Sequence, residues 1–186
     1  IQGSNGNVVA SINMTLNDLQ AVIGSEQLKK LPDLVTRRQN VVRKLTEKFK
    51  NLKSVKVPEQ LPGAEASYWF WRLEVNLDAI TCKDKFEYLN ALRAEGVPVN
   101  PEYRAFPHLM DWYKNRNVFP GTDLPWSAAE YTGEYKDKEK ANFPVPNALA
   151  AISVQYNLSI NESWDNDEVI DMIYEAYRKV DEAFAK

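Results

Sequence analysis

The strongest strand signal in the chain lies between two stretches of helical periodicity, and this order limits the fold. Ser67–Asn76 reads SYWFWRLEVN. Its aromatic and branched residues, with Arg72 and Glu74 alternating with apolar neighbours, are typical of a half-buried strand. Apolar residues recur at spacings of three and four before this segment and after it. A short sheet flanked by helices satisfies both patterns, so the sequence predicts an α/β or α+β domain.

The stretch before the strand predicts a long helix with an interruption. Thr15 and Asp18 have the spacing of a helix cap followed by an acid in the first turn. Pro32 removes a backbone donor and clashes with the preceding turn, so we expect a break there. The apolar positions on either side of it are Leu19, Val22, Ile23, Leu34, Val41, Leu45 and Phe49.

Further elements are expected after residue 52. Short strands are predicted at Val55–Val57, Val97–Asn100 and Ser153–Ile160. Thr81 and Asp84 begin a helix that Gly96 ends, and a short helix covers Asn147–Ile152.

The last helix is expected to begin near Asp165, with Glu168 as the partner of its cap. Its apolar residues follow one another at spacings of three and four, which predicts one buried face. They are Val169, Ile170, Ile173, Tyr174, Tyr177, Val180 and Phe184.

Charge and cysteine content exclude several classes of protein. The net charge of −3 argues against a nucleic-acid binder. Residues 29–56 are mainly basic and residues 162–182 mainly acidic, a pattern typical of two solvated helix faces lying near each other. With only Cys82 and His108, neither an internal disulfide nor a structural zinc site is expected, and a reducing, cytoplasmic location is favoured. No apolar run approaches the roughly 20 residues of a membrane helix.

Pro101–Pro146 is long, rich in aromatic residues, and interrupted by Pro, Gly and Asn. Long irregular segments in compact domains usually serve a function or form an interface.

Trp69 and Trp71 lie on the predicted strand, and their rings could serve the structure or bind a ligand. Core packing or a dimer contact explains them more simply than stacking on a sugar.

Asn13–Leu31 reads NMTLNDLQAVIGSEQLKKL. It resembles the helix that follows the cofactor lysine in the DegT/StrS family of sugar aminotransferases, where the pattern is N-x-R-M-x-[DE]-x-Q-A-A-I-G-x-x-Q-L-x-K-L. The resemblance continues through Arg37 and Arg38, Ser67–Val75, Leu92–Pro98 and Pro107–Leu109 to the final helix, and so spans nearly the whole chain.

This resemblance implies the C-terminal portion of a fold-type-I enzyme that uses pyridoxal 5′-phosphate (PLP). Such enzymes move an amino group from glutamate or glutamine to a keto sugar, often one attached to a nucleotide, and act as homodimers. Residues 1–52 would be an opening loop and long, broken helices that link to a missing large domain. Residues 53–186 would be the small C-terminal domain, a short, mostly antiparallel sheet flanked by helices.

The resemblance also suggests site residues. Asn13 matches an asparagine that reaches the cofactor phosphate of the neighbouring subunit, although an asparagine before a helix is also common in turns. His108 matches a histidine that faces the substrate, and Tyr103 and Arg104 stand on the same loop, where Arg104 could bind a carboxylate or phosphate. Thr15 departs from the arginine that the family often has there.

The family's Schiff-base lysine precedes the matched segment, so the resemblance predicts no catalytic residue within these 186 residues. PLP would bind only together with the missing N-terminal portion, and the chain alone would be inactive. Two alternatives stay open: a non-catalytic module for dimerisation or sugar-nucleotide binding derived from this family, and a helical scaffold. No metal, nucleic acid or membrane partner is expected.

Overall fold

The computed structural model describes residues 2–3, 6–7, 16–102, 110–133 and 153–186. The chain divides into two compact units. The smaller comprises Ile1–Leu16 and Tyr103–Asn147, and the larger comprises Asn17–Glu102 and Ala148–Lys186. The predicted helix at Asn147–Ile152 lies outside the described residues. The predicted domain boundary at residue 52 stays a prediction.

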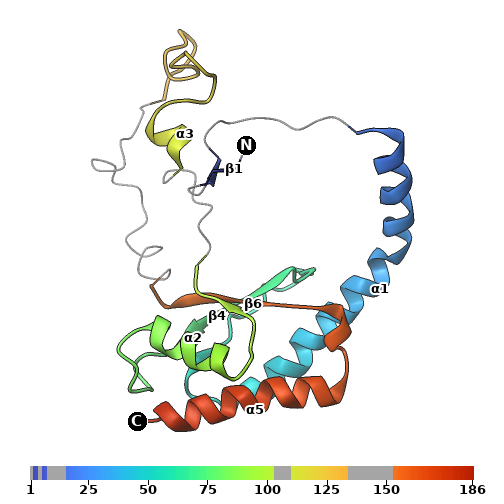
Figure 1. Cartoon of the computed structure of the whole chain (residues 1–186), viewed down its shortest axis with the longest axis vertical. Helices are drawn as coiled ribbons and strands as arrows, with labels where there is room; N and C mark the ends of the chain where they lie inside the picture. The colour runs from blue at the N-terminus through green and yellow to red at the C-terminus, as the bar shows by residue number, and fades with distance from the viewer. Residues whose placement is uncertain (1, 4–5, 8–15, 103–109, 134–152) are drawn as a thin grey trace. The chain divides into compact units, whose positions relative to one another are not determined.

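The larger unit holds a four-stranded antiparallel sheet in the order β3-β4-β6-β5, with helices packed against it (Figure 1). The predicted fold class, helices around a short antiparallel sheet, is therefore confirmed, and a purely helical scaffold is excluded. Its elements are α1 (Asp18–Phe49), β3 (Val55–Lys56), β4 (Phe70–Val75), α2 (Lys85–Ala94), β5 (Val99–Asn100), β6 (Gln155–Ser159), η2 (Glu162–Trp164) and α5 (Asp167–Phe184).

The two central strands divide their side chains between the two faces of the sheet. In β4, Trp71, Leu73 and Val75 are buried, while the alternate residues are only half-buried. In β6, Tyr156 and Leu158 lie opposite Leu73 and Trp71 and share the buried face. The predicted alternation is correct because a strand places successive side chains on opposite faces.

Aromatic rings join the helices to this buried face. Phe49, near the end of α1, stacks on Trp71 with 5.6 Å between ring centroids and lies 4.5 Å from the ring of Tyr177 in α5. The hydroxyl of Tyr156 donates to that of Tyr177 at 3.3 Å, so these two buried phenols satisfy one another. Burial raises the pKa of both phenols well above the ordinary value, and they stay neutral.

The predicted break at Pro32 is wrong, because α1 is continuous from Asp18 to Phe49 with Pro32 inside it. Leu28, whose carbonyl would have accepted the missing N–H of Pro32, is exposed, so water can satisfy that carbonyl. Thr36 Oγ1 donates to the Pro32 carbonyl at 2.9 Å, which adds a local bond. Figure 1 shows that α1 changes direction along its length, as helices containing proline commonly do.

Three predicted helix starts are shifted by a few residues. Asn17, not Thr15, caps α1, in a reciprocal capping box with Gln20. Asp84 alone caps α2, whereas the Thr81 hydroxyl bonds to the carbonyl of Phe184. Each of these starts has several polar side chains within two or three residues, and the residue that becomes the cap depends on tertiary contacts.

At α5 the cap is Asn166, whose side chain accepts from the amide of Glu168. Asp165, where the sequence predicts the start, instead accepts from Lys44 and Asn40 on α1. The predicted buried face of α5 is confirmed, as is the helix-ending role of Gly96, whose φ of 87° suits a residue without a side chain.

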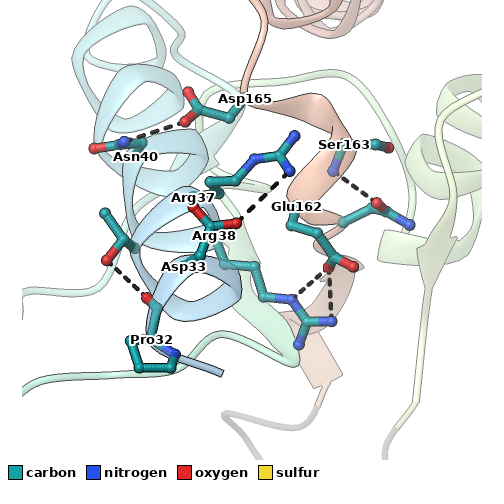
Figure 2. A network of polar contacts seen from close by, with 10 residues as sticks. Pro32, Asp33, Arg37, Arg38, Asn40, Glu162, Ser163 and Asp165 are labelled. Carbon is teal, nitrogen blue, oxygen red and sulfur yellow. Dashed lines mark hydrogen bonds and ion pairs between the residues drawn. The ribbon is translucent and has the colours of Figure 1, made fainter. Parts of the chain in front are cut away.

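The basic run on α1 and the acidic run at η2 and α5 do lie against each other, as predicted. Figure 2 shows Arg38 bound to Glu162 through two nitrogens at 2.9 Å and Asn40 bound to Asp165. Further along, Lys44 reaches both Asp165 and Asp167, and Lys48 reaches Asp171. We call this set the α1–α5 ion-pair ladder.

The smaller unit contains β1 (Gln2–Gly3), β2 (Gly6–Asn7) and α3 (Asp111–Lys114). Its described aromatic residues contact one another: Tyr113 makes edge contacts with Trp112 and Trp126. Arg116 pairs with Asp123 at 3.0 Å. No residue of α3 is buried, so its side chains pack only partially.

Leu45 provides a test of which half of α1 supports the fold. Leu45 is fully buried, and Leu45→Ala is expected to lower the free energy of unfolding by about 2–5 kcal/mol because a cavity remains. The matched change Leu28→Ala, at a site 66% exposed, should alter it by less than about 0.5 kcal/mol. Urea unfolding followed by circular dichroism measures both, and equal losses would contradict the described packing.

The ion-pair ladder predicts a pH dependence. Hydrogen bonding to backbone and to Arg38 lowers the pKa of Glu162, and the ammonium of Lys44 lowers the pKa of Asp165. Between the lowered values and the unfolded carboxyl values near about 4, the unfolded chain binds more protons. The stability from these pairs is therefore complete above that range and is lost as pH falls through the folded-state values.

Asp165→Asn should thus weaken the fall in melting temperature between neutral pH and about pH 3. The control is Glu26→Gln, which removes an exposed pair with Lys29 within one helix. If Asp165→Asn had the same acid dependence of melting temperature as the parent, the ladder would contribute nothing to the loss of stability at low pH.

Candidate functional site

The four site residues suggested by the sequence, Asn13, Tyr103, Arg104 and His108, lie outside the described residues, as does Thr15. The structure does describe the chain on either side of them. Asn17 follows Asn13 and caps α1, and Glu102 directly precedes Tyr103. Whether these four residues form one site is therefore a prediction that the structure leaves untested.

The start of α1 is not itself a strong phosphate site. The Asn17 side chain already accepts from the amide of Gln20 at 2.9 Å, and Gln20 in turn accepts from the amide of Asn17 at 3.1 Å. Asp18 adds a negative charge to the first turn, which opposes a bound anion. The amides of Asn17 and Gln20 are therefore not available to a phosphate, and the side-chain amide of Asn13, outside the described residues, is the donor that the sequence offers.

Two described lysines make contacts within the chain that account for their ammonium groups. Lys29 is exposed and paired with Glu26. Lys85 is buried at the start of α2, where its ammonium donates to the carbonyl of Gln155 at 3.1 Å, and burial lowers its pKa. β5 pairs with β6 at residues 157 and 158 and does not extend to residue 155. Lys85 therefore binds the carbonyl of Gln155 at a part of β6 that β5 does not cover. Its role in the described structure is to join α2 to the sheet.

The first half of α1 carries an apolar surface that nothing in the larger unit covers. Four large side chains on one side of the helix are 48–70% exposed. We call them the exposed face of α1: Leu19, Val22, Ile23 and Leu31. A set of this size along one helix is unusual on a solvated surface and is typical of a binding interface.

Three adjoining grooves lie where the loop 58–69 meets α1 and β4, with volumes of about 360, 420 and 550 Å³. Gln60 and Tyr68 line all three. Tyr68 has a φ of 49°, a left-handed conformation that is uncommon for a residue with a side chain. Such strain is found most often at binding and active sites.

The structure separates the two tryptophans that the sequence treated alike. Trp71 is 4% exposed and belongs to the core, as the simpler interpretation predicts. Trp69 is 74% exposed and lines the largest groove beside Phe70 and Arg72. Alternation along a strand would place residues 69 and 71 on the same face, so it could not have predicted this difference, which arises because β4 begins at Phe70.

Sequence reasoning missed Asn157. This residue is 5% exposed, and its Oδ1 atom has no hydrogen-bond partner in the described part of the chain. A single asparagine in a strand gives no sign of such a state before the register is known.

Cys82 is a buried thiol, and burial raises its pKa to about 11. Among the described residues, no cluster of acidic, histidine or cysteine side chains could hold a metal ion. Within the described residues, no helix has the length and apolar character needed to cross a membrane.

Comparison with solved structures supports the fold. The aminotransferase TlmJ from Streptoalloteichus hindustanus matches with a TM-score of 0.59 at 20% identity, over 90% of this chain and 37% of that chain. For the putative sugar aminotransferase Spr1654 from Streptococcus pneumoniae in its PLP form, the TM-score is 0.63 at 20% identity, over 91% of this chain and 36% of that chain. For the aminotransferase from Psychrobacter cryohalolentis, the TM-score is 0.65 at 15% identity, over 90% of this chain and 39% of that chain.

The chain therefore spans less than half the length of each of these structures. A search of curated proteins found no significant match. The model of the DegT/DnrJ/EryC1/StrS aminotransferase family, however, matches residues 2–156. That match covers most of the chain, including α1 and β4, so this protein belongs to the DegT/DnrJ/EryC1/StrS aminotransferase family.

Proposed function

We propose that this chain works as the C-terminal segment of a PLP-dependent aminotransferase that moves an amino group from glutamate or glutamine to a keto sugar or nucleotide-linked keto sugar. The observation that carries the proposal is the family match over residues 2–156, joined to a chain that spans only 36–39% of three similar structures. The chain would supply substrate contacts and a dimer surface, and an N-terminal domain would supply the lysine that holds PLP.

PLP, when bound, supplies an electron sink for chemistry at the amino carbon. In the proposal, Asn13 contributes an amide donor to the cofactor phosphate, and Tyr103, Arg104 and His108 contact the substrate. Arg104 fits a carboxylate or phosphate, since a guanidinium offers two parallel donors. The active site would form in a cytoplasmic homodimer. The chain alone would be inactive.

The exposed face of α1 supports a larger partner within the same polypeptide. Its four apolar residues lie ahead of the part of α1 that packs on the sheet, so they can be covered without disturbing the core. We propose that the N-terminal large domain covers them. The alternative, a non-catalytic module for dimerisation or sugar-nucleotide binding, would keep the same surface without the catalytic lysine.

The test of function is to express residues 1–186 together with the upstream coding sequence, add PLP, and record visible absorbance and amino transfer to a keto sugar. We expect bound cofactor and activity from the longer protein and neither from the chain alone. A longer protein that ignores PLP would decide for the non-catalytic module.

In the longer protein, Asn13→Ala should weaken PLP retention by about tenfold, as expected for losing one hydrogen bond to a charged group. Asn17→Ala is the matched control, since it removes the helix cap but leaves the proposed phosphate contact. Equal losses in the two variants would assign the effect to a loosened helix and not to the amide of Asn13.

The proposed cover of α1 can be tested with Ile23→Glu. In the chain alone, where Ile23 is 53% exposed, the melting temperature should hardly change. In the longer protein the charge would be buried, and the melting temperature should fall by several degrees. Ser25→Glu, on the opposite side of the helix by its spacing, is the control. Equal effects of Ile23→Glu in both proteins would contradict an interdomain contact.

A further inference from the structure

Two of the three grooves beside the loop 58–69 are continuous with each other along α1. The 360 Å³ groove and the 420 Å³ groove share four lining residues, Val42 and Thr46 of α1 and Gln60 and Tyr68 of the loop. All of these residues belong to the larger unit. We call the first the polar groove and the second the apolar groove. Because their walls are shared, one small molecule can extend from one groove into the other.

The polar groove is lined by charges of both signs, one from each wall. Arg43 comes from α1 and Glu65 from the loop. Within the described part of the chain, neither side chain has an ion-pair partner. Glu47 also lines this groove, but its carboxylate is bound to the ammonium of Lys50 at 2.7 Å. The groove therefore presents a guanidinium and a carboxylate that are both available to a ligand.

The loop is bonded on both sides of Glu65. Gln39 of α1 donates to the carbonyl of Ala66 at 3.1 Å, and Gln60 donates to the carbonyl of Ala64. The backbone of Glu65 lies between these two bonds and is held beside the helix. Two opposite charges on separate walls, held apart and not paired with each other, are complementary to a ligand that carries both an anion and a cation.

The apolar groove continues from Arg43 toward the end of α1. It opens because β3 ends at Lys56 while β4 extends to Phe70, so the described sheet has no strand beside Trp71 on that side. From Arg43 to Phe49 the helix rises about 9 Å, at 1.5 Å per residue. The apolar side chains that line this groove are Val42, Phe49, Leu52, Val55, Val57 and Trp71.

The rim of the apolar groove disfavours a second charge on the ligand. Lys50 is occupied by Glu47, and Glu59 adds an exposed carboxylate that repels an acidic group. A charged group placed beside Trp71 would also lose hydration. An apolar side chain, in contrast, gains free energy by leaving water.

We propose that the joined grooves bind a free α-amino acid with a large apolar side chain. Its carboxylate binds Arg43, its ammonium binds Glu65, and its side chain occupies the apolar groove beside Val57 and Trp71. The proposal goes beyond the aminotransferase function. The proposed amino donors, glutamate and glutamine, have polar side chains that this groove disfavours, and the suggested substrate residues are not part of the site.

The experiment titrates the isotopically labelled chain with L-phenylalanine at millimolar concentrations. It follows the NMR signals of the Arg43 side chain and the Val57 amide, one from each groove, and both should saturate with the same dissociation constant. L-alanine, which lacks the apolar group, and L-glutamate, which adds a charge, should each bind about tenfold more weakly or less. No saturable shift with L-phenylalanine, or equal binding of L-glutamate, would overturn the proposal.

Two derivatives of the ligand test the two charges separately. N-acetyl-L-phenylalanine keeps only the carboxylate, and L-phenylalaninamide keeps only the ammonium. Each should bind about tenfold more weakly than L-phenylalanine. If either bound as tightly as L-phenylalanine, the grooves would recognise one end of a peptide, and the assignment to a free amino acid would fail.

Matched variants assign each charge to its residue. Arg43→Gln should bind L-phenylalanine and its amide alike, and Glu65→Gln should bind L-phenylalanine and its N-acetyl derivative alike. Both side chains are exposed, so the melting temperature should hardly change. Lys30→Gln, which removes an exposed positive charge elsewhere on α1, is the control and should bind as the parent does. Arg43→Gln with the ligand preferences of the parent would contradict the proposed site.

Discussion

The contact of Phe49 with the rings of Trp71 and Tyr177 is the interaction on which the larger unit depends. It joins α1, β4 and α5 at one point, although these elements lie far apart in the sequence. Val41, Val42 and Leu45 of α1 are buried in the same core, and the helix continues from them away from the sheet toward its own N-terminus. The same helix is thus a core element at one end and an exposed apolar surface at the other.

The ion-pair ladder fixes the direction in which that free end leaves the core. Arg38, Lys44 and Lys48 follow one another along α1 and meet Glu162, Asp165 and Asp171, so rotation of α1 would break several contacts at once. Exposed pairs contribute little stability individually. Their combined effect here is on orientation, since they determine the direction in which the exposed face of α1 points.

The residues predict the elements of this fold better than their ends. The alternation in β4 and the spacing in α5 report directly on burial, so both faces could be predicted from the sequence. The effect of Pro32 could not be predicted in the same way. The cost of a proline depends on whether the carbonyl four residues earlier can reach water, and only the structure shows that Leu28 is an exposed residue. The caps failed for a related reason: Asp165 could cap α5, but Lys44 and Asn40 bind it first.

The same distinction applies to function. A motif such as Asn13–Leu31 points to a family, since the order of residues is enough to recognise it. The outer face of the sheet has no such motif, because Arg72, Asn157 and Asn100 become neighbours only through strand register. Elsewhere in this core the buried polar groups are paired: Ser54 with Tyr88, and Tyr156 with Tyr177. The Asn157 oxygen is the exception among the described buried side chains, and no residue pattern identifies it before the register of β4, β5 and β6 is known.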